Sequence, residues 1–165
     1  GNDPRRGLLA ARGMAAINAI GPLVDLLGEE GKDRTDVRRA AILSLRQTLS
    51  RGPEQANLLY DRKKKTGLLT ERGYKPTEAE TIVDLLYPLP SDLRKRRETF
   101  ELFVQLLKHD KLAVRELAYH HLIVLAPGEK AEYNPAGSAT DRTRGYAAWK
   151  KLLDEGKLPP PPPKP

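Results

Sequence analysis

The amino-acid sequence predicts an all-α protein built from pairs of amphipathic helices. Small and apolar residues recur at helical spacing in two segments, 37–49 and 114–125. These segments share a local pattern at an offset of 77 residues, from 37 to 114. With 39% apolar and 31% charged residues among 165, the chain has the composition of a globular domain. No apolar run approaches the roughly 20 residues that span a bilayer, so we expect no membrane insertion.

The first segment is expected to form one helix with a single buried stripe. Thr35 or Asp36 can cap its start by accepting a hydrogen bond from an unpaired backbone N–H, and Gly52-Pro53 ends it. The stripe is small and apolar, which suits close packing against another helix. Its members are Val37, Ala40, Ala41, Ser44, Leu45, Thr48 and Leu49.

The second segment lies in HDKLAVRELAYHHLIV, residues 109–124, which holds all three histidines. His120 and His121 are neighbours that point about 100° apart on a helix, so they cannot share a metal ion, for which helical pairs use i, i+4 spacing. His121 lies on the apolar stripe and is expected to be buried and bonded to a neighbouring helix. His109 precedes Asp110, which is expected to cap or form the turn. The stripe comprises Val114, Leu117, Ala118, His121, Leu122 and Leu125, and stops at Pro127-Gly128.

No catalytic, cofactor or metal site is predicted. The sequence has no cysteine, no G-x-S-x-G and no glycine-rich phosphate loop with its lysine. We therefore expect a protein that is not an enzyme. The rival interpretation, an unrecognised enzyme, would require a deep pocket with convergent polar groups.

The two segments look like copies of one repeat. LVDLL (23–27) and FVQLL (103–107) end a preceding apolar-periodic helix, an aspartate stands four residues before the valine, and an arginine directly follows the valine. The pattern of helix, short turn with aspartate, then VRRAA (37–41) or VRELA (114–118) resembles the HEAT repeats of armadillo-like α-solenoids. The resemblance implies a right-handed α-α superhelix of about three helix pairs that serves as a non-catalytic interaction or scaffold module.

A middle helix pair is expected because 77 residues are close to two repeats of roughly 40. Residues 54–71 would supply its first helix, although basic residues interrupt the apolar face and Gly67 weakens it, so two short helices are the alternative. Residues 77–87 would supply the second helix, with Pro76 pre-set for a first helical turn. Ser91 or Asp92 would then cap the first helix of the third pair.

The two chain ends are expected to differ. An N-terminal helix of about residues 4–27 should break or kink at Gly21-Pro22.

The expected domains are a helical repeat array over 1–128, a polar loop and capping helix over 129–157, and a proline-rich tail over 158–165. The tail is typical of a solvated polyproline II segment, with a recognition peptide as the alternative. The face of the capping helix comprises Tyr146, Trp149, Leu152 and Leu153.

The run from Gly73 through EYNPAG to the tryptophan helix is also similar to the ends of uncharacterised HEAT-like proteins, many of them exported, of environmental bacteria. That resemblance implies a place in the periplasm or cell envelope and no known activity. The chain begins with Gly1 rather than methionine, so an export signal is expected upstream of it. The compartment stays open at this point.

The candidate partner-binding residues are those opposite the buried stripes, because second helices of successive repeats line one concave side. Mixed charge with an aromatic and aliphatic side chains suits a protein or peptide partner better than phosphate. A solvated face that binds nothing is the alternative. The candidates are Arg39, Leu43 and Arg46 in the first copy and Glu116, Tyr119, His120 and Ile123 in the second.

Nucleic-acid binding is the alternative function. The net charge is +7, and two basic clusters stand out, Arg62–Lys65 (RKKK) and Arg94–Arg97 (RKRR). Each cluster is flanked by acidic residues, and neither is interleaved with several aromatic residues as a base-stacking platform would be. We therefore expect both clusters to be solvated helix faces and disfavour a nucleic-acid partner.

Overall fold

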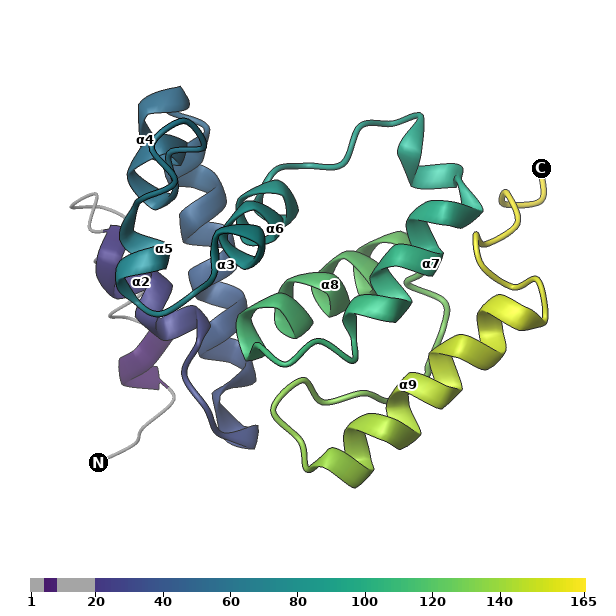
Figure 1. Ribbon diagram of the computed structural model, residues 1–165. Coiled ribbons are helices and arrows are strands. Elements are labelled where there is room, and N and C mark those ends of the chain that lie inside the picture. Colours follow the sequence, from purple (N-terminus) through teal and green to yellow (C-terminus); the bar gives the residue numbers. More distant parts are fainter. Residues whose placement is uncertain (1–4, 9–19) are drawn as a thin grey trace. The chain divides into compact units, whose positions relative to one another are not determined.

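The computed structural model describes residues 5–8 and 20–165, apart from the side chain of Lys32, and within these ranges the chain is helical (Figure 1). The described residues form no strand, and one isolated antiparallel bridge joins Asp61 and Thr66. The predicted all-α fold class is therefore confirmed.

The chain divides into two compact units, Gly1–Tyr87 and Pro88–Pro165. The boundary falls inside the predicted array 1–128, where Pro88 and Pro90 interrupt the helical pattern. Each unit has its own set of packed helices.

The first unit is organised around α3, which contacts α2, α4 and α6. The predicted stripe of α3 is confirmed, since all of its members are buried except Ala40, which is half-buried. α2 contains Gly21-Pro22, and residues 9–19, on which the predicted break or kink depends, lie outside the described residues. The elements are α2 (Ile20–Leu27), η1 (Lys32–Arg34), α3 (Thr35–Leu49), α4 (Pro53–Leu59), α5 (Leu68–Glu71) and α6 (Pro76–Leu86).

The start of α3 differs from the prediction. Arg34 occupies the N-cap position and makes no side-chain capping bond, while Thr35 and Asp36 lie inside the first turn. The predicted cap is wrong because the 3-10 turn η1 leads directly into α3 and already places Thr35 in helical geometry. The Thr35 hydroxyl instead accepts a hydrogen bond from Arg38 Nη2 at 3.2 Å.

Between α3 and α6 the chain forms two short helices, α4 and α5. They are separated by a turn in which the Asp61 carboxylate accepts hydrogen bonds from the backbone N–H of Lys63 (2.9 Å) and Lys64 (3.0 Å). A carboxylate that binds N–H groups two and three residues ahead stabilises a turn against a continued helix. The alternative of two short helices is confirmed, and Pro76 lies in the first turn of α6 as predicted.

The second unit is organised around α7, which contacts both α8 and α9. Phe100, Phe103 and Val104 of α7 are buried. Arg96 is the N-cap of α7, so the prediction that Ser91 or Asp92 caps this helix is wrong. The reason is that a separate 3-10 turn, Leu93–Lys95, lies between Asp92 and the start of α7. The elements are η2 (Leu93–Lys95), α7 (Arg97–Leu106), α8 (Leu112–Leu125) and α9 (Ala139–Asp154).

The two units share one arrangement at the turn between paired helices, made by the arginine that follows the repeat valine. Arg38 is buried, and its Nη1 donates to the carbonyl oxygens of Glu29 (3.0 Å) and Gly31 (2.8 Å). Arg115 is also buried, and its Nη1 donates to the carbonyl oxygens of His109 and Asp110, both at 2.8 Å. Each guanidinium therefore supplies hydrogen bonds to carbonyl oxygens of the turn that precedes its own helix.

The segment 129–138, expected as a polar loop, is fastened to the second unit. Tyr133 is 8% exposed, and its hydroxyl donates to the Leu107 carbonyl oxygen at 2.6 Å. The Pro135 carbonyl oxygen accepts a hydrogen bond from Arg115 Nε at 2.9 Å. These bonds join the loop to the end of α7 and to α8.

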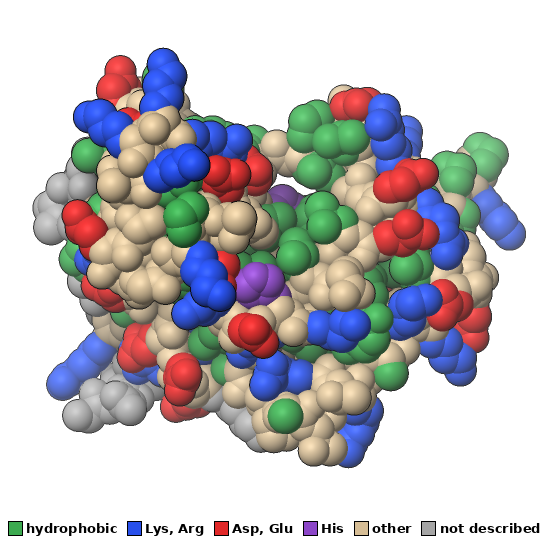
Figure 2. Space-filling view, in the orientation of Figure 1, with side chains coloured by type: hydrophobic (Ala, Val, Ile, Leu, Met, Phe, Trp, Pro, Cys, Tyr) green, Lys and Arg blue, Asp and Glu red, His purple; other side chains and the backbone are tan. Residues whose placement is uncertain are grey.

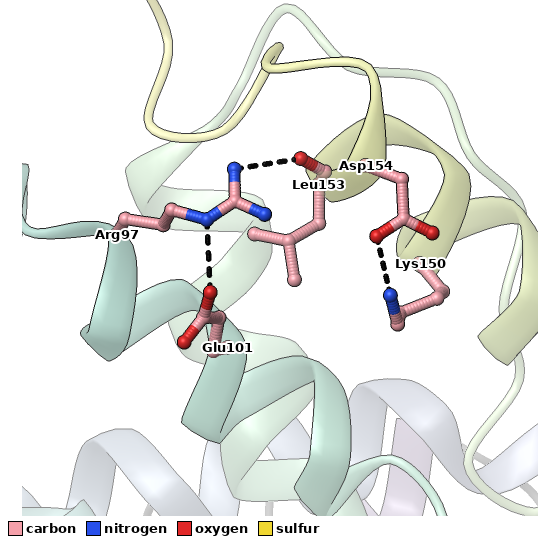
Figure 3. Close-up of polar contacts among 5 residues, drawn as sticks. All are labelled: Arg97, Glu101, Lys150, Leu153 and Asp154. Carbon is pink, nitrogen blue, oxygen red and sulfur yellow. Dashed lines mark hydrogen bonds and ion pairs between the residues drawn. The ribbon is translucent and has the colours of Figure 1, made fainter.

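α9 packs on α7 through the face predicted for a capping helix. Trp149 and Leu153 are buried, while Tyr146 and Leu152 are half-buried. The Arg97 guanidinium of α7 donates through Nη1 to the Leu153 carbonyl oxygen at 3.0 Å, as Figure 3 shows. This bond holds the start of α7 against the end of α9.

The proline-rich tail is attached to the unit at its first residue. α9 ends before Gly156, whose φ of 72° lies in the left-handed region that glycine enters without strain. Leu158 is only 1% exposed, whereas residues 161–165 are exposed. The prediction that the whole tail is solvated is thus wrong at Leu158, because burying this apolar side chain removes it from water.

Gly145 allows α9 to approach the 129–138 loop. A Cβ at this position would lie 2.6 Å from Tyr133 Cδ2 and 2.9 Å from the Glu132 carbonyl oxygen. We expect Gly145→Ala to lower the free energy of unfolding by at least about 1 kcal/mol, because the backbone must move to relieve the overlap. Gly128→Ala is the control, since a Cβ there meets no atom within 4 Å. Urea unfolding of both variants checks this, and equal stabilities would contradict it.

The two buried arginines give a second prediction. Replacing either Arg38 or Arg115 by methionine keeps much of the side-chain volume but removes the donors from carbonyl oxygens in the turn. We expect each substitution to lower the free energy of unfolding by about 2–4 kcal/mol. Arg39→Met, next to Arg38 but only half-buried, should cost less than about 1 kcal/mol. Calorimetry on all three variants tests the contrast.

Candidate functional site

The three candidate residues on α3 lie on one face of the helix. Leu43 is 58% exposed, and Arg39 and Arg46 beside it are half-buried. Arg46 reaches α6, where its Nη2 lies 3.4 Å from the Leu85 carbonyl oxygen, and burial lowers the pKa of its guanidinium. The structure therefore brings an exposed aliphatic side chain and two arginines together on α3.

The candidates on α8 are less accessible than predicted. Glu116 is 1% exposed, so its place on an exposed face is a wrong prediction. The physical reason is that α8 is covered on more than one stripe, since Arg115 and Glu116 are buried in addition to the apolar positions. The 129–138 loop adds a second layer beside α7, because Arg115 bonds to Pro135 in that loop.

Tyr119 belongs to an aromatic cluster within the second unit. Its ring lies edge-on to Tyr133 at 5.3 Å and to Trp149 at 6.2 Å between centroids. Edge-to-face pairs at these distances are favourable packing contacts. The half-buried Tyr119 thus links α8 with the loop and α9, and its role as a partner contact stays a prediction.

His120 and Ile123 are half-buried on α8, and the next residue along, Val124, is 60% exposed. Val124 was not predicted as a surface residue, because the stripe was chosen by analogy with α3 at a fixed offset. The accessible part of α8 is therefore its last turn.

His121 and His109 make separate contacts in the second unit. His121 is buried, as predicted, and its ring stacks on Phe103 of α7 with centroids 4.8 Å apart and planes 8° apart. His109 Nδ1 accepts a hydrogen bond from the Lys111 N–H at 3.0 Å. Lys111 is the N-cap of α8 and makes no side-chain capping bond. The turn that was assigned to the Asp110 side chain is instead closed by His109.

The basic cluster 62–65 lies on the exposed turn after α4, so its prediction as a helix face is wrong (Figure 1). Asp61 binds the backbone N–H groups at the start of the turn and prevents a helix there. Arg62 pairs with Asp84 of α6. The side chains of Lys63, Lys64 and Lys65 are exposed and make no ion pair with any described residue.

The basic cluster 94–97 is largely engaged within the second unit. Arg94 Nε donates to the Leu89 carbonyl oxygen at 2.9 Å, and Arg96 pairs with Asp92 at 3.3 Å. Arg97 pairs with Glu101 at 2.8 Å, in addition to its bond to α9 (Figure 3). The cluster spans η2 and the first turn of α7 rather than one helix face, which corrects the prediction.

Within residues 5–8 and 20–165, no three His, Asp or Glu side chains group as a metal site would require. Over the same ranges, the helices are too short or too polar to cross a bilayer. Family models, curated proteins and solved structures give no match to this chain.

Tyr133 gives a pH-dependent prediction. Burial is the main cause that raises the pKa of its hydroxyl from 10.0 to about 12, so folding favours the neutral phenol. The stability that the neutral Tyr133 hydroxyl contributes is complete below pH 10 and is lost as the pH rises toward about 12. Tyr133→Phe should cost about 1 kcal/mol at neutral pH, because the Leu107 carbonyl oxygen loses its donor.

Urea unfolding of the wild-type protein and Tyr133→Phe across this alkaline range measures the effect. The stability difference between them should shrink as the pH rises. Tyr87→Phe, which alters a tyrosine that is 38% exposed, is the control and should follow the wild type. A constant difference between wild type and Tyr133→Phe would show that the hydroxyl does not carry this dependence.

Proposed function

We propose that the chain is a HEAT-like helical repeat module that binds a protein or peptide partner and performs no catalysis. In this proposal its helix pairs follow one another as a right-handed superhelix, with α9 as the closing helix. The irregular middle pair consists of α4 and α5 with α6. The role is that of an interaction or scaffold module.

The repeat part of the proposal is supported by the likeness between the two units. In each unit a helix, a short turn and a second helix follow one another, as α2 with α3 and α7 with α8. Val37 and Val114 are both fully buried, and the arginine after each binds carbonyl oxygens of the preceding turn. A shared core position and a shared polar contact at one offset are typical of repeats.

The partner-binding part rests on the exposed face of α3. Leu43 is 58% exposed between two arginines. Covering an aliphatic side chain with a partner removes apolar surface from water, which stabilises the complex. The arginines beside it can stay hydrated at the rim of such an interface. Because Glu116 is buried, α3 is the better supported surface. In the second unit, Val124 in the last turn of α8 is exposed.

Affinity capture from extracts of the source cells tests the proposal. Leu43→Glu places a charge at the centre of the surface, and we expect it to abolish capture of the partner bound by the wild-type chain. Leu102→Glu on α7 is the matched control, since Leu102 is 54% exposed in the other unit. Circular dichroism verifies that both variants keep their helices. Equal capture by both variants would show that α3 is not the binding surface.

Nucleic-acid binding through clusters 62–65 and 94–97 is the second candidate. The one observation that favours it is the exposure of Lys63, Lys64 and Lys65 in the first cluster. If it held, duplex or single-stranded DNA would bind at low salt, with an affinity that falls steeply as salt is added. Replacing Lys63, Lys64 and Lys65 together by glutamine would then remove the binding. Under our proposal, no binding is measured for the wild type.

A further inference from the structure

The first unit contains a depression of about 510 Å³ between α4, the turn that follows it and the end of α6. Ala56, Val83 and the partly exposed Tyr87 give it an apolar wall, and Asn57 adds an amide. Tyr60 also lines it. The charged residues Asp61, Arg62, Lys63 and Asp84 complete the lining. Small-molecule sites combine an apolar wall with polar groups that fix the ligand's orientation.

Tyr60, which lines this depression, carries an unusual group, a hydroxyl that is buried beneath the surface. The residue is 2% exposed, and its buried hydroxyl makes no hydrogen bond to any described residue. Burial, and then the negative charge of Glu80, raise the pKa of Tyr60, so the hydroxyl stays protonated at neutral pH and can donate. A buried donor without a partner is rare in folded proteins and points to an acceptor that the chain itself does not supply.

Arg62 and Lys63 are the charged lining residues that can bind an anion, and they stand beside two carboxylates, Asp61 and Asp84. Arg62 pairs with Asp84, but both side chains are more than half exposed, and such surface pairs are weak enough to exchange partners. The Asp61 carboxylate is occupied by the N–H groups of its own turn. Lys63, which also lines the depression, has no ion pair with any described residue. In Figure 2, Lys and Arg side chains gather over α4, with acidic side chains among them.

We propose that this depression binds an organic carboxylate with an apolar body. The carboxylate would be held by Arg62 and Lys63, and would accept the hydrogen bond that the Tyr60 hydroxyl does not make within the chain. The apolar body would lie against Val83 and the ring of Tyr87. Inorganic phosphate would leave the apolar wall uncovered, and an organic cation would face Arg62 and Lys63. The site is independent of the α3 surface.

Three probes of one shape but different charge test the proposal on the full chain by heteronuclear NMR. They are phenylacetate, phenylacetamide and phenethylamine. Phenylacetate should cause saturable shifts of backbone amides in 56–63 and 83–87, phenylacetamide should bind at least about threefold more weakly, and phenethylamine should not bind. Shifts that are equal for all three probes, that do not saturate, or that fall only elsewhere would overturn the proposal.

Two variants separate the site from the fold. Tyr60→Phe should weaken phenylacetate binding at least about threefold without lowering stability, because its hydroxyl has no partner to lose. Lys63→Gln should weaken binding similarly, whereas Lys75→Gln, an exposed lysine in the same unit outside the lining, should not. Unchanged binding in both Tyr60→Phe and Lys63→Gln would overturn the assignment.

The same carboxylate chemistry has two sources, a free acid or the carboxyl end of a peptide. The tripeptide Gly-Gly-Phe with a free carboxyl end distinguishes them. Tighter binding of the tripeptide than of phenylacetate assigns the site to chain ends. Tighter binding of phenylacetate assigns it to free acids.

Discussion

A buried guanidinium bound to backbone carbonyl oxygens is the contact on which the helix pairs α2–α3 and α7–α8 depend. The turns before α3 and α8 receive no side-chain cap at the helix start. Arg38 and Arg115 reach back from the helix to supply donors to carbonyl oxygens of these turns. A buried charge is tolerated only when its donors are satisfied, so the position of the turn and the position of the arginine determine each other.

This arrangement explains which parts of the fold could be predicted from sequence. The stripes of α3 and α8 follow from helical periodicity, and Val37, Leu45, Val114 and His121 are buried as that periodicity requires. The caps of α3 and α7 were predicted wrongly, whereas the start of α6 at Pro76 was predicted correctly. Local capping rules look for a side chain that accepts from backbone N–H groups at the helix start, whereas these turns are held by arginines inside the helix that donate to carbonyl oxygens.

The candidate site was predicted less well, for a related reason. The exposed residues of α8 were inferred from those of α3, but α8 is also covered by the 129–138 loop, and periodicity within one helix carries no information about a loop. Leu43 is exposed as expected, while Glu116 is buried. Tyr60 had no sequence signal, because whether a buried hydroxyl finds a partner depends on contacts between elements that sequence patterns do not give.

The 129–138 loop has a practical consequence for protein engineering. By composition it looks like a linker into which a tag or a recognition sequence could be inserted. Because Tyr133 and Pro135 bond to α7 and α8, an insertion between them would separate two attachment points that hold the unit together. The exposed residues 161–165 form no hydrogen bond or ion pair with the described residues, so the end of the tail accepts such additions instead.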